Sequence, residues 1–242
     1  MKWILSYPRS GSHLVRVWIE ALTGIPTASI YPNDPYPMGP PPPGFSREDN
    51  ATPVFTKIHR FVHANPLRQH QLSRANRLIR VDRLRKRKTE PAKGLLFRLR
   101  NPRACIASDA RDTPRVLRPV RFPIEASRYL RNCTDFLDWH GPKLLLYYED
   151  MVGRPERSIE TLGAFVGAER TSIERCTREA PLLAAHGISM LRRRPLSRQD
   201  PSRGANRFGP LVPLTVVPRR VRPLLERYGR AGSTRGGSAS GL

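Results

Sequence analysis

The sequence predicts an α/β protein in which a parallel sheet is flanked by helices on both faces. Short apolar runs alternate along the chain with segments whose apolar residues recur at helical spacing, which is typical of strand–helix–strand units. The run at 143–148 is almost continuously apolar, as in a strand that is buried on both faces. The length of 242 residues favours one domain, because domains usually contain about 100 to 200 residues.

Local signals place the individual elements. An apolar run at 3–6 ends at a Tyr-Pro pair, and the segment 12–23 has one apolar face and stops before Gly24. In the segment 155–166 a proline stands at the start of an amphipathic pattern that Gly167 ends. Strands are predicted at 3–6, 53–58, 94–99 and 143–148, helices at 12–23, 103–110, 124–140 and 155–166, and a further helix from the capping-box pattern at 171–174.

Three segments interrupt this alternation. The loop at 31–45 contains seven prolines, too many for regular structure, and is predicted to be extended. The segment 67–93 is dense in arginine, and the tail 229–242 is dominated by glycine, serine and alanine, which predicts disorder. We therefore expect one domain at 1–228 that includes a proline-rich loop and a basic insertion, followed by the tail.

The composition points to an anionic partner. Lysine and arginine number 43 against 20 acidic residues, which gives a net charge of +23 and a strong positive field. The cysteines, Cys105, Cys133 and Cys176, show no CxxC or Cys/His pattern, so we expect buried thiols and no structural metal. No apolar run reaches the roughly 18 residues of a membrane span, and the apolar run near the start of the sequence is too short for a signal peptide. A soluble, cytoplasmic protein is therefore expected.

The first strand and its helix are joined by the run SYPRSGSH at 6–13. Backbone amides of residues 9–12, the positive end of the helix, the Arg9 guanidinium and the hydroxyls of Ser10 and Ser12 all suit an anion. These features predict a P-loop-like phosphate site, although the Lys-Ser pair of the Walker motif is missing. The alternative for this loop alone is a serine-rich helix cap beside a surface arginine.

Three further segments carry polar residues at strand ends. Arg100 directly follows the predicted strand 94–99, and Ser108 stands eight residues after Arg100, so that both can converge on one phosphate. The run FTKIH at 55–59 contains Lys57 and His59, and the run LYYED at 146–150 contains Tyr148. Ligands bind at the carboxyl ends of the strands in sheets of this kind, so these residues are candidates for one site.

Taken in order, the four segments resemble the sulfotransferases that use 3′-phosphoadenosine 5′-phosphosulfate (PAPS), and the resemblance extends from residue 3 to about residue 167. It implies that the loop around Gly11 binds the 5′-phosphosulfate of the cofactor and that Arg100 binds its 3′-phosphate. The cofactor-binding residues implied in this way are Arg9, Ser10, Gly11, Ser12, His13, Arg100, Ser108 and Tyr148.

The same resemblance implies the reaction. A sulfuryl group passes in line from PAPS to an acceptor hydroxyl or amine, without a metal or a covalent intermediate, and 3′,5′-adenosine bisphosphate is the product. His59 is expected to take the acceptor proton, since an imidazole with a reference pKa of about 6.5 suits a general base near neutral pH. Lys57 and Arg9 are expected to stabilise the charge that develops on the transferred group and on the leaving oxygen.

The chain departs from the family in four places. Arg9 stands where the family often has lysine, and Leu14 where it often has a bulky aromatic residue. The C-terminal Arg-Lys-Gly element is only echoed by Ser-Arg-Gly, in which Arg203 becomes the expected 3′-phosphate contact. His59 and Arg100 are 41 positions apart, which is longer than the family's connection, and the basic insertion in this interval is expected to recognise the acceptor.

Two other functions stay open at this point. A nucleotide-dependent phosphotransferase of related fold would need magnesium ligands near the loop, and the sequence offers no paired acidic site there. A basic nucleic-acid-binding module would explain the charge, but no RNA-binding aromatic signature or helix-turn-helix pattern is present, so nucleic acid is not the expected partner. The expected acceptor is a small molecule or a glycan, including an anionic one; steroid, phenol, lipid and peptide tyrosine are not distinguished.

Overall fold

The computed structural model describes residues 2–8, 10–30, 38–59, 93–109, 118–189 and 217–229. The chain forms two compact units, one from Met1–Arg100 and Trp139–Gln199 and the other from Asn101–Asp138 and Asp200–Leu242. The expected domain at 1–228 stays a prediction. The basic stretch 67–92, the tail from residue 230 and residues 31–37 of the proline-rich loop lie outside the described residues, whereas residues 38–45 form turns and bends without helix or strand.

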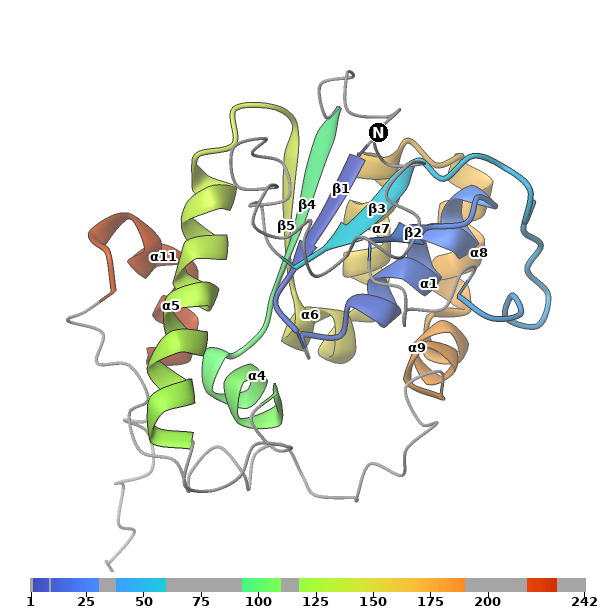
Figure 1. Ribbon diagram of the computed structural model, residues 1–242. Coiled ribbons are helices and arrows are strands. Elements are labelled where there is room, and N and C mark those ends of the chain that lie inside the picture. Colours follow the sequence, from blue (N-terminus) through green and yellow to red (C-terminus); the bar gives the residue numbers. More distant parts are fainter. Residues whose placement is uncertain are drawn as a thin grey trace, which may run out of the picture. The chain divides into compact units, whose positions relative to one another are not determined.

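The first unit is built on a parallel five-stranded sheet with the order β2-β3-β1-β4-β5 (Figure 1). The strands are β1 (Lys2–Ser6), β2 (Ala28–Ser29), β3 (Phe55–Ile58), β4 (Gly94–Leu99) and β5 (Lys143–Tyr147). The strand β1 lies between two strands that follow it in the sequence, so the connections cross over the sheet. The sheet is flanked by helices, which confirms the predicted α/β fold class.

Four helices of this unit pack together on one side of the sheet (Figure 1): α1 (Ser12–Thr23), α7 (Pro155–Val166), α8 (Arg170–Arg178) and α9 (Ala180–Ser189). Ile4 of β1 and Leu96 of β4 belong to one buried cluster with Trp18 of α1 and Leu162 of α7. Burying a side chain of this size stabilises the fold by roughly 1.5–3 kcal/mol. The apolar face that the sequence predicts for 12–23 is therefore the face that meets the sheet.

The second unit contains α4 (Pro102–Asp109), α5 (Arg118–Leu137), the short 3₁₀ helix η5 (Arg219–Val221) and α11 (Arg222–Gly229). Within it, α5 contacts α4 and η5, and the Arg220 guanidinium donates to Asp138 at 2.6 Å. The helix α5 begins before the predicted residue 124 and includes Pro123. Proline has no amide hydrogen, so Pro123 cannot donate the hydrogen bond to residue 119 that another residue would make at this position of the helix.

The local predictions fail at two further points. The predicted strand 143–148 ends at Tyr147, because the six-residue helix α6 (Tyr148–Gly153) begins there with Glu149 and Asp150 in its first turn, where acidic groups favour the helix dipole. The helix predicted from the pattern at 171–174 is present as α8, but the capping box is wrong: α8 begins at Arg170, and its N-cap residue, Glu169, makes no side-chain capping bond.

Two features of the composition have structural counterparts. The three cysteines are free and buried, as predicted, and burial raises the pKa of the Cys176 thiol to about 11 and raises that of Cys133 further. Within the described residues, none of the helices is both long and apolar enough to cross a membrane.

Candidate active site

The carboxyl ends of the parallel strands bring most of the predicted site residues to one edge of the sheet. Because neighbouring parallel strands all end on the same side, the ends of β1, β3, β4 and β5 lie along this edge. Ser6 ends β1, His59 follows β3, Arg100 follows β4 and Tyr148 follows β5. The site is therefore assembled from four segments that are far apart in the sequence.

The loop between β1 and α1 is a tight turn that leads straight into the helix. The Ser10 amide donates to the Tyr7 carbonyl oxygen at 3.1 Å, and the Leu14 amide donates to the Gly11 carbonyl oxygen at 3.0 Å. Gly11 is the N-cap of α1, with a φ of 84°, in the left-handed region that glycine adopts most easily. Of the amides expected to face an anion, that of Ser10 is therefore used to close the turn, and that of Arg9 lies outside the described residues.

The side chain of Ser10 is the notable polar group of this loop. It is fully buried, and its hydroxyl has no hydrogen-bond partner among the described residues. Leaving a buried polar group without a partner costs about 1–3 kcal/mol. Ser12 is buried and His13 is half-buried in the first turn of α1, where helix amides have no partner within the helix. An oxyanion at the loop would satisfy the Ser10 hydroxyl and the positive helix end together.

The orientation of His59 follows from its contact with Ser6. The Nδ1 nitrogen of His59 lies 2.6 Å from the Ser6 carbonyl oxygen and 3.3 Å from the Ser6 hydroxyl. A carbonyl oxygen only accepts hydrogen bonds, so Nδ1 carries the proton and donates it. In the neutral ring the basic lone pair is then on Nε2. The ring is oriented by the backbone of β1, the strand that leads into the loop.

The strand register places two cations on the face that α1 covers. Lys57 pairs with Ile4, and Arg98 pairs with Ser6, two residues further along β1. Side chains two apart on a strand share a face, and paired residues of neighbouring parallel strands do so as well. Lys57 is 2% exposed and Arg98 is fully buried. Arg98 therefore joins the predicted residues of the site, although no motif had marked it.

Tyr148 lies against two arginines, Arg98 of β4 and Arg100, which directly follows this strand. The Arg98 guanidinium carbon lies 4.8 Å from the centre of the Tyr148 ring, and that of Arg100 lies 4.4 Å from it. Both distances are within the range of cation–π attraction. The sequence did hold a signal for Arg98, since it is a charged residue inside an apolar strand and stands two positions before Arg100.

The structure does not test the placement of three predicted site residues. Ser108 is half-buried on α4 of the second unit, so its convergence with Arg100 on one phosphate stays a prediction. Arg9 and Arg203 lie outside the described residues. In the described ranges, histidine, cysteine, aspartate and glutamate side chains form no group of three that could hold a metal ion.

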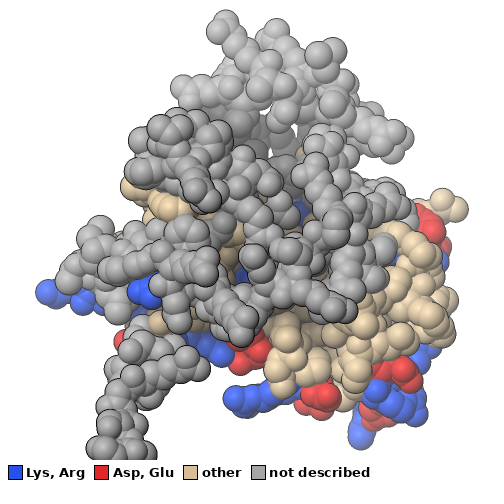
Figure 2. All heavy atoms as spheres, turned by 90° about the horizontal axis from the view of Figure 1, so that it is seen from below, with Lys and Arg blue, Asp and Glu red and all other residues tan. Residues whose placement is uncertain are grey.

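The surface charge is mixed on the face seen from below in Figure 2. Along its lower rim, lysine and arginine side chains lie next to aspartate and glutamate side chains. Among the ion pairs of the described residues, Arg170 and Glu174 form an exposed one, with a nitrogen–oxygen distance of 2.8 Å. The arginine-dense stretch that contributes to the net charge of +23 lies at 67–92, outside the described residues.

The chain is similar to a crystal structure of a sulfotransferase from Alicyclobacillus acidocaldarius, with 15% sequence identity and a TM-score of 0.39. The match covers 79% of this chain and 96% of that chain. No protein-family model and no curated protein matches the sequence. The function is therefore inferred from the residues of the site.

Proposed function

We propose that this chain is a sulfotransferase that moves a sulfuryl group from PAPS to an acceptor hydroxyl or amine and releases 3′,5′-adenosine bisphosphate. The observation that carries the proposal is the buried Ser10 hydroxyl, which has no partner among the described residues and stands directly before the 12-residue helix α1. A tetrahedral oxyanion, phosphate or sulfate, is the ligand class that such a loop accepts.

The remaining residues of the edge suit the two ends of this cofactor. Gly11 and Ser12 open α1 and hold the 5′ end, and Arg100, stacked on Tyr148, is the proposed contact of the 3′-phosphate. Arg9, Ser108 and Arg203 are assigned to the same cofactor by the sequence resemblance. PAPS supplies an activated sulfuryl group whose leaving oxygen belongs to a phosphate.

His59 acts as the base in this proposal. Its Nδ1–H bond to the Ser6 carbonyl oxygen, at 2.6 Å, leaves Nε2 to accept the proton of the acceptor. When Nε2 takes that proton, the ring becomes cationic and the Nδ1–H bond becomes charge-assisted, which strengthens it. Lys57, two residues before His59 and almost fully buried, is the proposed cation beside the transferred group.

The first test is ligand binding by the full chain. We expect 3′,5′-adenosine bisphosphate to raise the melting temperature, since a ligand at 100 times its Kd stabilises the folded state by about 2.7 kcal/mol. ATP with Mg²⁺ at the same concentration should give a smaller shift. A larger shift with ATP and Mg²⁺ would favour the phosphotransferase, and no shift with either nucleotide would reject both enzymes.

The second test separates chemistry from binding. His59→Ala should lower the turnover of labelled PAPS by about 100-fold or more, the usual contribution of a positioned base, on whichever acceptor a screen of acceptor classes identifies. The affinity for 3′,5′-adenosine bisphosphate should stay within about threefold, because the base does not hold the cofactor. His140→Ala, at an exposed histidine, is the matched control. A His59→Ala variant that keeps more than roughly a tenth of the turnover would remove His59 from the mechanism.

A further inference from the structure

We propose that Arg98 is a positioning residue of the oxyanion site: it holds Gly11 in place and supplies a buried positive charge beneath the loop of residues 10–12. The sequence motifs assign the cations of the site to Arg9, Lys57, Arg100 and Arg203, and Arg98 is not among them. The identity of the anion rests on the proposed function, whereas the role of Arg98 toward a tetrahedral oxyanion does not.

The sheet register explains why Arg98 reaches the loop. Arg98 pairs with Ser6, the last residue of β1, and therefore shares the face of the sheet on which Ile4 and Leu96 meet α1. Along this face Arg98 is one pleat nearer than Leu96 to the edge where the loop begins. Its side chain is thus directed into the layer between the sheet and the first turn of α1.

The contact with Gly11 is close. A Cβ atom built on Gly11 would lie 2.6 Å from Nη1 and 2.7 Å from Nη2 of Arg98. Since both terminal nitrogens are almost equally near, the edge of the guanidinium faces the point at which a Cβ of residue 11 would lie. Any side chain at this position would have to displace the guanidinium or the loop.

The position and the charge of Arg98 are both fixed. The guanidinium is fully buried and lies 4.8 Å from the centre of the Tyr148 ring. An arginine stays protonated at every physiological pH, and a buried charge is screened by salt much less than a surface charge. The N-terminus of α1 contributes a further partial positive charge above it. A bound oxyanion is attracted by both.

Ser10 provides an independent sign of a ligand at the same loop. Its buried hydroxyl has no partner among the described residues, and it is the neighbour of the glycine that Arg98 contacts. An oxyanion that accepts a hydrogen bond from this hydroxyl is attracted by the Arg98 charge, which lies on the other side of the loop. The role of Arg98 is therefore electrostatic and does not require it to touch the ligand.

The test compares charge with shape at position 98 in the full chain. Arg98→Lys keeps the charge, whereas Arg98→Met keeps much of the volume and removes the charge. The probes are inorganic pyrophosphate, 3′,5′-adenosine bisphosphate and adenosine 3′-monophosphate, which lacks the 5′ group. We expect Arg98→Met to weaken the first two probes by about tenfold or more, Arg98→Lys by less than about threefold, and neither to change the third.

The outcomes separate this proposal from the proposed function. In one outcome, wild type binds pyrophosphate and Arg98→Met binds it more weakly, but wild type prefers ATP with Mg²⁺ to 3′,5′-adenosine bisphosphate. This result supports the role of Arg98 and rejects the sulfotransferase. Equal affinities in wild type, Arg98→Lys and Arg98→Met overturn the role of Arg98, as does equal loss for all three probes. Wild type that binds neither pyrophosphate nor 3′,5′-adenosine bisphosphate overturns both. Arg98→Gln replaces Arg98→Met if the latter shows no cooperative melting transition.

Discussion

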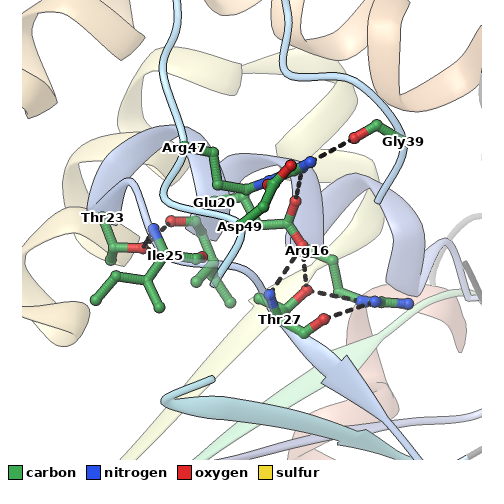
Figure 3. Close-up of polar contacts among 9 residues, drawn as sticks. Arg16, Glu20, Thr23, Ile25, Thr27, Gly39, Arg47 and Asp49 are labelled. Atoms are coloured by element: carbon green, nitrogen blue, oxygen red, sulfur yellow. Dashed lines mark hydrogen bonds and ion pairs between the residues drawn. The ribbon is translucent and has the colours of Figure 1, made fainter. Parts of the chain in front are cut away.

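Two fully buried arginines of the first unit, Arg16 and Arg98, have different surroundings. Arg16, on α1, donates from Nε to the Thr27 hydroxyl and from Nη2 to the Thr27 carbonyl oxygen, each at 2.8 Å (Figure 3). Thr27 in turn donates its hydroxyl to Glu20 at 2.6 Å and its amide to Glu20 at 2.9 Å. Arg98, in contrast, stacks on Tyr148 and lies against the loop glycine, Gly11.

The Arg16 network continues into the segment after the proline-rich loop (Figure 3). Arg47 donates to the second Glu20 oxygen at 2.5 Å, to the Gly39 carbonyl oxygen at 2.6 Å and to Asp49 at 2.5 Å. The network thus contains two carboxylates of its own and ties residues 38–49 to α1. Arg47 is thus neutralised by carboxylates of the chain itself. The loop beside Arg98 differs in that it combines the positive end of α1 with the buried Ser10 hydroxyl, which has no partner among the described residues.

Removing Glu20 should damage stability more than any change at the loop. Glu20→Ala would leave the Arg47 guanidinium buried beside one exposed carboxylate, Asp49, and would remove the acceptor of both Thr27 bonds. Breaking a buried ion pair on one side typically costs about 3–5 kcal/mol of unfolding free energy. Urea unfolding followed by circular dichroism measures this loss.

The matched control is Glu174→Ala, which removes the acid of the exposed pair with Arg170. A surface pair contributes about 0–1 kcal/mol, so this variant should unfold almost like wild type. At temperatures where Glu20→Ala is folded, its affinity for 3′,5′-adenosine bisphosphate should match that of wild type. Equal stability losses for the two variants would show that the Glu20 network is not the anchor of residues 38–49.

Local sequence signals were sufficient wherever one segment determines its own structure. The bounds of α1, β4 and α7 agree with the predictions, because glycines at 24 and 167 stop two of the helices and the strand is an unbroken apolar run. The loop between β1 and α1 was predicted for the same reason, since its turn, its glycine and its helix are contiguous.

Contacts that depend on register between distant strands could not be predicted in this way. Arg98 reaches Gly11 only because β4 pairs with β1 so that Arg98 lies beside Ser6, and no single-strand pattern fixes that offset. The bond from His59 to the Ser6 carbonyl oxygen has the same origin in β3. The Arg47 bridge to Glu20 spans an irregular loop, for which the sequence offers no periodic signal.

A smaller effect on stability, but one confined to the site, is expected at Gly11. Gly11 and Gly167 both have a positive φ, 84° and 75°, but only Gly11 has a neighbour where a Cβ would lie: nothing is within 4 Å of such an atom at Gly167. Gly167→Ala should therefore lose about 1–2 kcal/mol, the cost of the left-handed conformation alone. Gly11→Ala should lose more, because the Arg98 guanidinium must also move.

A double-mutant cycle isolates the part that belongs to Arg98. If the added methyl group acts by displacing the guanidinium, Gly11→Ala and Arg98→Ala should be coupled by about 0.5–3 kcal/mol, since the three atoms nearest to the methyl group all belong to the Arg98 side chain. Gly167→Ala and Arg98→Ala should be additive. Gly11→Ala should also weaken 3′,5′-adenosine bisphosphate binding, which Gly167→Ala should leave unchanged. Additive effects at Gly11, with unaltered binding, would show that Arg98 serves the stability of the fold, as Arg16 does, and not the binding of an anion.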